Sequence, residues 1–121
     1  MVCMVPANLS AFMANILDAT LNDGTLELVI KSQRLDAVTA PDLKKECAVL
    51  WQPAIQRVIA DLEAVDFLDS SGVGALLSIY KRLRPESASL QLVRVQPAVQ
   101  SVIELLRLHR IFDVQPKSFV V

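Results

Sequence analysis

The sequence is short of the residues that build metal centres, disulfide scaffolds and catalytic triads. Its 121 residues include two cysteines, Cys3 and Cys47, and a single histidine, His109. The cysteines lie far apart and neither belongs to a C-x-x-C pair, which argues against a zinc site, and one histidine is poor material for a triad. Cys47 falls at an apolar helical position and is interpreted as a core residue. We therefore expect no metal, no cofactor and no enzymatic activity.

Long apolar runs and clustered basic residues are also missing. No run approaches the length of a membrane span, and no basic residue precedes Lys31, so the basic start of a secretory signal is absent. The net charge is −1, and the one basic cluster, Lys81-Arg82-Leu83-Arg84, is interpreted as a solvated helix end. Because a nucleic-acid binder usually shows a basic face, we expect neither nucleic acid nor membrane insertion, and a cytoplasmic location.

Apolar residues, by contrast, are plentiful. They make up 53% of the chain, enough for the core of one domain, and one interpretation of the excess is an apolar surface that meets a partner. Their spacing predicts strands near residues 15–21, 25–31, 55–62 and 90–95. It also predicts helices from Thr39 to before Pro53, from about Ser71 to Leu83, and from Pro97 to about Leu108.

Local signals support this order of elements. Asn22-Asp23-Gly24 predicts a hairpin turn, and Thr39 is expected to cap the first helix. The strand, helix and strand between residues 55 and 95 should form a parallel crossover. In the last helix Val99, Ile103 and Leu106 are expected to face inward. The predicted class is α/β: one domain with a mixed sheet over residues 15–121, after an arm or short helix over residues 1–14.

The segment Asp69-Ser70-Ser71-Gly72-Val73-Gly74 is the one that carries chemistry. It holds two of the three glycines, and it lies where a buried strand turns into a helix, which is where open α/β sheets place their sites. Free N–H groups at a helix start attract anions, and the missing side chains at Gly72 and Gly74 would let a backbone or a phosphate approach closely. Ser70 and Ser71 are expected to be exposed there. Spacing alone nevertheless favours a plainer interpretation, in which serine only caps the helix, Asp69 is a turn residue and Gly74 serves close helix packing.

A family resemblance changes that balance. The segment from Asp61 to Leu77, centred on Phe67-Leu68-Asp69-Ser70-Ser71-Gly72, closely resembles the signature of the STAS domain family of anti-sigma factor antagonists and sulfate-transporter tails. Arg34-Leu35-Asp36-Ala37-Val38-Thr39-Ala40-Pro41-Asp42-Leu43 resembles its other recurrent segment, and Val93 through Val114 resembles its final strand and helix. The resemblance implies a STAS-like fold, a mixed four- to five-stranded sheet packed with three to four helices. Gln33 departs from it, because the family often has glycine there.

The resemblance also implies a function. In anti-sigma factor antagonists the first serine after the aspartate is phosphorylated; here that is Ser70, with Ser71 as the second choice. The unmodified form would bind a histidine-kinase-like serine kinase that acts as an anti-sigma factor, phosphorylation would release it, and a PP2C-type phosphatase would reset the switch. The implied partner-binding residues are Asp36, Asp69, Ser70, Ser71, Gly72 and Gly74. The alternative is a STAS-type accessory subunit of a membrane lipid-transport ATPase complex, in which the serine need not be modified.

Overall fold

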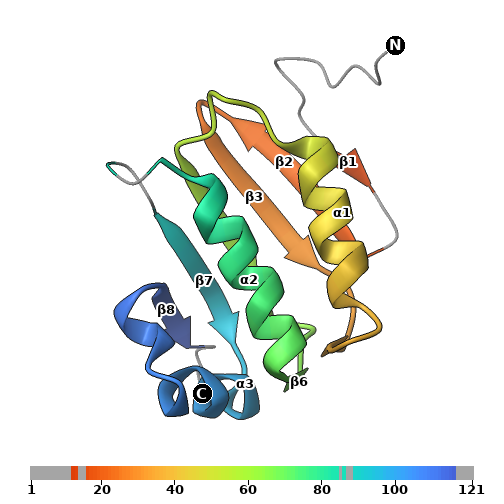
Figure 1. Ribbon diagram of the computed structural model, residues 1–121, viewed down its shortest axis with the longest axis vertical. Helices are drawn as coiled ribbons and strands as arrows, with labels where there is room; N and C mark the ends of the chain where they lie inside the picture. Colours follow the sequence, from red (N-terminus) through yellow and green to blue (C-terminus); the bar gives the residue numbers. More distant parts are fainter. Residues whose placement is uncertain (1–11, 14–15, 85, 87–88, 117–121) are drawn as a thin grey trace, which may run out of the picture.

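The chain folds as a mixed β-sheet covered by helices, as the computed structural model of residues 12–13, 16–84, 86 and 89–116 shows (Figure 1). The main sheet has the strand order β1-β2-β3-β5-β7-β8, and β4 pairs with β6 in a small second sheet. The strands are β1 (Phe12–Met13), β2 (Leu17–Asn22), β3 (Thr25–Ile30), β4 (Arg34–Leu35), β5 (Arg57–Asp61), β6 (Phe67–Leu68), β7 (Leu90–Val95) and β8 (Asp113–Pro116). The helices are α1 (Ala40–Leu50), α2 (Ser70–Arg82), α3 (Pro97–Leu105) and the short 3₁₀ helix η2 (Leu108–Arg110).

The sheet combines one hairpin with a parallel half. Strands β2 and β3 are antiparallel and join at a two-residue turn, where Asp23 has a φ of 51° and Gly24 a φ of 79°. Both values lie in the left-handed region that this turn type requires, so the hairpin predicted from Asn22-Asp23-Gly24 is confirmed. In the other half of the sheet, β3 pairs with β5, β5 with β7 and β7 with β8, and all three pairs are parallel. The parallel pairing of β5 and β7 confirms the crossover predicted between residues 55 and 95.

Helices α1 and α2 lie side by side on one face of the sheet, and α3 lies at the end where β7 finishes (Figure 1). Alternate residues of β3 point into the core, where Leu26, Leu28 and Ile30 are all buried. Cys47 of α1 and Leu76 of α2 are buried in the same core. This packing of two amphipathic helices on one sheet face confirms the predicted α/β class, and the burial of Cys47 confirms its predicted core position.

Some details differ from the prediction. Thr39 occupies the N-cap position of α1 but makes no side-chain cap hydrogen bond, because its hydroxyl serves the preceding turn. Leu106, expected inward, is 50% exposed, because α3 ends at Leu105 and Arg107 then turns the chain with a φ of 59°. Strand β8 was not predicted, since four residues that include a proline give no clear alternation.

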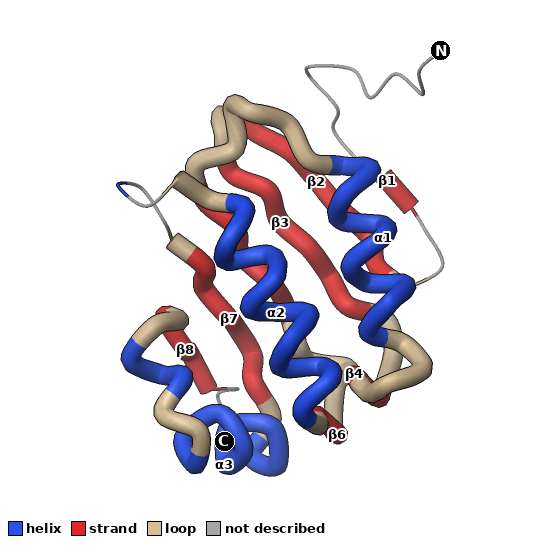
Figure 2. The backbone as a smooth tube through the Cα atoms, viewed as in Figure 1, coloured by secondary structure: helices blue, strands red, loops and turns tan. Residues whose placement is uncertain are grey.

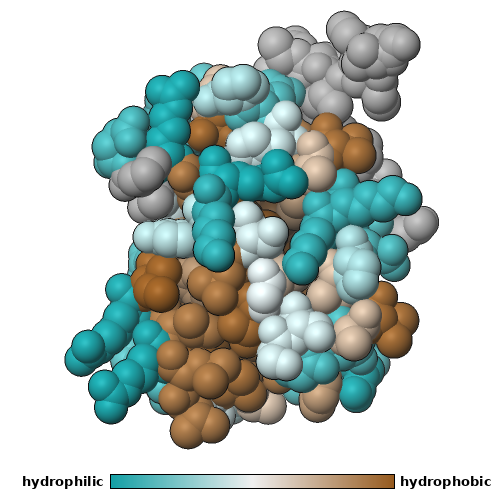
Figure 3. All heavy atoms as spheres, in the orientation of Figure 1, coloured by the Kyte–Doolittle hydropathy of each residue, from teal (hydrophilic) through white to brown (hydrophobic). Residues whose placement is uncertain are grey.

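Some of the chain's many apolar side chains are exposed on the surface. Leu105 is 81% exposed, Leu106 is 50% exposed and Ile111 is 44% exposed. Figure 3 shows apolar atoms gathered over the lower part of the molecule in this view, over and beside α3. Of the predicted arm or short helix over residues 1–14, only strand β1 falls within the described residues. Within the same residues, no helix is long and apolar enough to cross a membrane.

Candidate functional site

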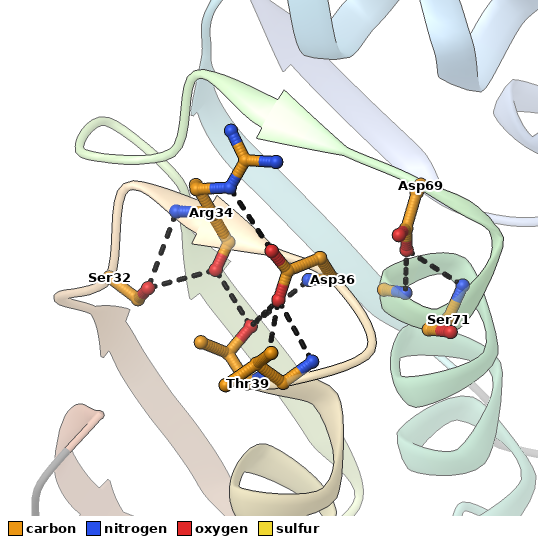
Figure 4. Close-up of polar contacts among 8 residues, drawn as sticks. Ser32, Arg34, Asp36, Thr39, Asp69 and Ser71 are labelled. Carbon is orange, nitrogen blue, oxygen red and sulfur yellow. Dashed lines mark hydrogen bonds and ion pairs between the residues drawn. The ribbon is translucent and has the colours of Figure 1, made fainter.

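The site is built where β6 runs into α2, and its first feature is the cap of that helix. Asp69 stands at the N-cap in extended conformation, and its Oδ1 accepts hydrogen bonds from the N–H groups of Ser71 at 2.8 Å and Gly72 at 3.1 Å. The plain interpretation gave the cap to a serine, but the structure gives it to Asp69 (Figure 4). The hydroxyl of Ser70 is thereby left without a hydrogen bond among the described residues.

The two serines differ in access. Ser70 is the first residue of α2 and is exposed, whereas Ser71 is half-buried. A modifying enzyme needs an accessible hydroxyl, so the geometry favours Ser70. Its position at a helix N-terminus also suits an added anion, because the backbone N–H groups there carry a partial positive charge.

The two glycines of the segment have different surroundings. Gly72 is buried, and a Cβ atom there would lie 2.3 Å from the carbonyl oxygen of Leu35 and 2.6 Å from Cδ1 of Leu68. The close backbone approach expected at Gly72 is therefore made by the chain's own β4. A Cβ atom on Gly74 would meet nothing within 4 Å, so the packing role considered for that glycine is wrong for the described residues.

The second predicted segment is held next to the first. Strands β4 and β6 are parallel, with Arg34 opposite Phe67 and Leu35 opposite Leu68. Figure 2 shows both short strands near the start of α2. The N–H of Asp69 also donates to the carbonyl of Leu35 at 3.2 Å. These contacts place the loop that carries Asp36 beside the start of α2, although the two segments lie more than thirty residues apart.

Asp36 organises its own loop. Its Oδ1 accepts hydrogen bonds from the N–H groups of Val38 at 3.0 Å and Thr39 at 3.2 Å, and its Oδ2 pairs with Nε of Arg34 at 3.1 Å (Figure 4). The hydroxyl of Thr39 closes the loop, accepting from the Asp36 N–H at 3.0 Å and donating to the Arg34 carbonyl at 2.8 Å. The hydrogen bond from Arg34 is the largest cause that holds the pKa of Asp36 below its ordinary value.

Arg34 is a site residue to which the sequence analysis assigned no role. Its guanidinium carbon lies 4.0 Å from the centroid of the Phe67 ring, and its side chain is 58% exposed. The only sequence signal is a basic residue directly before the Leu35-Asp36 pair, because the aromatic partner comes from another strand. Beside it lies a hollow of about 400 Å³, lined by Ser32, Gln33, Arg34, Asp36, Val38 and Thr39.

Other expectations concern surface residues and metals. Lys81, Arg82 and Arg84 are exposed, which confirms their interpretation as solvated residues at the end of α2. His109 is exposed in η2, far along the chain from the site. Within the described ranges, no three His, Cys, Asp or Glu side chains are grouped so that they could hold a metal ion.

Comparison with known proteins agrees with this geometry. The model of the STAS domain family matches residues 17–118, which include both segments of the site. The chain therefore belongs to the STAS domain family.

Proteins of similar sequence indicate which kind of STAS protein this chain resembles. BtrV from Bordetella bronchiseptica, named as a candidate anti-sigma factor antagonist, is 30% identical over 80 residues, covering 66% of this chain and 69% of BtrV. The anti-sigma-B factor antagonist of Bacillus subtilis is 24% identical over 101 residues, covering 84% of this chain and 91% of that protein. The relatives are thus named for antagonism of anti-sigma factors.

Solved structures share the fold. An anti-sigma factor antagonist from Mycobacterium paratuberculosis superimposes with a TM-score of 0.72 at 27% identity, covering 83% of this chain and 84% of that one. Unphosphorylated SpoIIAA, an anti-sigma factor antagonist, gives a TM-score of 0.67 at 22% identity, with coverages of 81% and 86%. Phosphorylated SpoIIAA of Bacillus gives a TM-score of 0.62 at 20% identity, with coverages of 81% and 89%. The chain therefore has the fold of these antagonists.

Proposed function

We propose that this chain is a phosphorylation-controlled protein-binding switch of the anti-sigma factor antagonist type, which acts in the cytoplasm. The unmodified form binds a histidine-kinase-like serine kinase that acts as an anti-sigma factor, and phosphorylation of Ser70 releases it. A PP2C-type phosphatase then restores the unmodified form. The observation that carries the proposal is the division of roles at the start of α2, where Asp69 caps the helix and the exposed Ser70 hydroxyl stays unbonded among the described residues.

The chemistry of the switch follows from this arrangement. The Oγ of Ser70 forms a bond to the γ-phosphorus of ATP held by the kinase, the bond from that phosphorus to the bridging oxygen breaks, and ADP leaves. The hydroxyl proton goes to a base on the kinase, while Oδ1 of Asp69 continues to accept the two N–H groups of the helix cap. The chain itself supplies an accessible, correctly placed hydroxyl and is not an enzyme.

The consequence of phosphorylation lies at the surface that faces the partner. Ser70 and Gly74 stand one helical turn apart on α2, so both lie on one face of the helix. A partner packed on this face must admit about −1.5 to −2 additional charge when Ser70 is modified. Inside the chain the same charge meets the helix N-terminus, which tolerates it. The phosphate therefore weakens binding to the partner and does not destabilise the fold of this chain.

The remaining implied partner-binding residues take different roles in this proposal. Asp69 and Gly72 set the position of the first turn of α2, the former as its cap and the latter by its tight contact with β4. Gly74 leaves open space in which the partner can approach the helix, and half-buried Ser71 lies at the edge of the contact. Asp36 shapes the neighbouring loop.

The test uses a histidine-kinase-like serine kinase from the organism that encodes this protein. After incubation with that kinase and ATP, intact mass should increase by one phosphate, and Ser70→Ala should abolish the increase. Ser71→Ala is the matched control and should still accept the phosphate. Ser70→Asp should weaken kinase binding about a thousandfold, which corresponds to roughly 4 kcal/mol. No phosphate with any kinase, together with co-purification with a transporter ATPase, would establish the accessory-subunit alternative instead.

A further inference from the structure

We propose that Arg34, Val38 and Phe67, here named the Arg34 surface, form a further contact surface that binds a carboxylate of the kinase partner beside Ser70. The inference rests on the proposed function for the identity of the partner. Its own basis is the arrangement of one arginine, one exposed valine and one aromatic ring at the edge formed by β4 and β6.

The guanidinium of Arg34 is fixed from two sides. Its Nε donates to Oδ2 of Asp36 at 3.1 Å, and its central carbon lies over the ring of Phe67 at 4.0 Å from the centroid. Among the described residues, the two terminal nitrogens have no acceptor. These nitrogens form an edge that matches the two oxygens of a carboxylate. Because an arginine side chain loses rotamer entropy when it is ordered, an arginine that is already held binds an anion at lower cost.

Asp36 is not the group that this loop presents to a partner. Its Oδ1 accepts the N–H groups of Val38 and Thr39, its Oδ2 pairs with Arg34, and its side chain is only 17% exposed. Asp36 is therefore a positioning residue, which holds the loop and aims Arg34. The group left open to the partner is a cation, and charge complementarity calls for an acidic side chain opposite it.

The apolar part of the surface narrows the kind of partner. Val38 is 78% exposed and Phe67 is 37% exposed. The ring of Phe67 lies against the Arg34 guanidinium, and Val38 lines the same hollow as Arg34. Arginine and aromatic side chains are enriched at the centres of protein interfaces. A partner segment that fits would carry Asp or Glu next to an apolar residue. A second copy of this chain fits poorly, because a two-fold contact centred on Arg34 would set that cation against itself.

One partner can cover this surface and Ser70 together. The Leu35 carbonyl accepts the N–H of Asp69, and Leu35 also lies against Gly72 in the first turn of α2. The Arg34 surface is thus attached to the helix start that carries the phosphorylated serine. A kinase that binds Arg34 would therefore also hold the hydroxyl of Ser70 close to the ATP in the kinase active site.

The test compares Arg34→Ala, Arg34→Lys and Arg34→Glu in binding to the kinase used in the phosphorylation test above. We expect Kd to rise about 10- to 100-fold for Ala and further for Glu, with partial recovery for Lys, which keeps the charge without the planar fork. Arg57→Ala is the matched control, an exposed arginine on β5 outside this surface, and should leave Kd unchanged. A Glu→Arg or Asp→Arg change in the kinase should restore binding to Arg34→Glu.

A second readout separates positioning from direct contact. In Arg34→Ala, the pKa of Asp36 should rise towards its ordinary value of 3.8 in an NMR titration, because its largest lowering cause is removed. Asp36→Asn should weaken kinase binding less than Arg34→Glu, since it loosens Arg34 without reversing the charge.

Each outcome decides a different point. Unchanged Kd for Arg34→Ala and Arg34→Glu, with Ser70 still phosphorylated, overturns the Arg34 surface and leaves the switch intact. A wild-type chain that neither binds nor is phosphorylated by the kinase overturns the switch, and this inference with it. A concentration-dependent dimer that Arg34→Glu abolishes would show that the occupant is a second copy, and would overturn the assignment to the kinase.

Discussion

Gly72 and Gly74 lie two residues apart in α2 and are opposite in what they tolerate. A Cβ atom on Gly72 would lie within 2.3 Å of a backbone oxygen that cannot move aside, so Gly72→Ala should destabilise the fold by about 1–3 kcal/mol. Gly74→Ala adds a methyl group to open space within a helix and should stabilise by about 0.5–1 kcal/mol. Urea unfolding of the two variants measures both shifts.

The paired design makes the result unambiguous. If both substitutions stabilise, the contact between Gly72 and Leu35 is not present in solution. If Gly74→Ala weakens kinase binding while it stabilises the fold, the open space at Gly74 is used by the partner. The sequence could not separate the two glycines, because the nearest atom that restricts Gly72, the carbonyl oxygen of Leu35, belongs to a strand more than thirty residues away.

The thiol of Cys47 is buried, and its burial changes how readily it loses its proton. Burial raises its pKa from 9.0 to about 12, so in the folded chain it should stay protonated and resist alkylation by iodoacetamide at pH 8. Because the folded state keeps this proton longer than the unfolded state, the contribution of Cys47 to stability should fall as the pH rises from 9 to about 12. The measurement uses a Cys3→Ser background, since Cys3 lies outside the described residues. Rapid labelling without denaturant would contradict the buried position.

At the scale of the element, α2 depends on its cap. Asp69→Ala removes the acceptor of two backbone N–H groups and should cost about 1 kcal/mol of stability, while Asp69→Asn should cost less because an oxygen remains. Asp66→Ala, an exposed acidic position three residues earlier, is the control and should change stability by less than about 0.5 kcal/mol. The free energy of unfolding in urea reports all three. Equal losses for Asp69→Ala and Asp66→Ala would mean that net charge, and not the cap, is being measured.

The elements that the sequence predicted share a strong local signal. The hairpin turn at Asn22-Asp23-Gly24 has its own backbone chemistry, and strand β7 matches the predicted range 90–95. Strands β4 and β6 have two residues each and exist only because each pairs with the other, so no window along the chain reveals them. The end of α3 was missed for a related reason, because Arg107 adopts a positive φ with no glycine to indicate it.

At the scale of the whole molecule, the sequence located both halves of the site but not what joins them. The segment around Ser70 was found from its two glycines at a strand-to-helix turn, and the family resemblance added the segment around Asp36 and chose Ser70 over Ser71. Their contact depends on the β4–β6 pair and on Gly72, which are long-range features of the fold. The cation–aromatic pair of Arg34 and Phe67 lies outside sequence reasoning for the same reason.

The whole-molecule prediction is that phosphorylation changes the complex and leaves the fold of this chain unchanged. The N-terminus of α2 stabilises a phosphate on Ser70 by about 0.3–1 kcal/mol. Repulsion from the neighbouring carboxylate of Asp69 opposes this stabilisation. The phosphorylated and unmodified chains should therefore unfold within about 1 kcal/mol of each other in urea. Backbone amide NMR shifts should change only around β4, β6 and the first turn of α2. If the phosphorylated protein is much less stable, or if the shifts spread across the sheet, phosphorylation changes the fold of this chain itself. Release of the kinase would then follow from local unfolding.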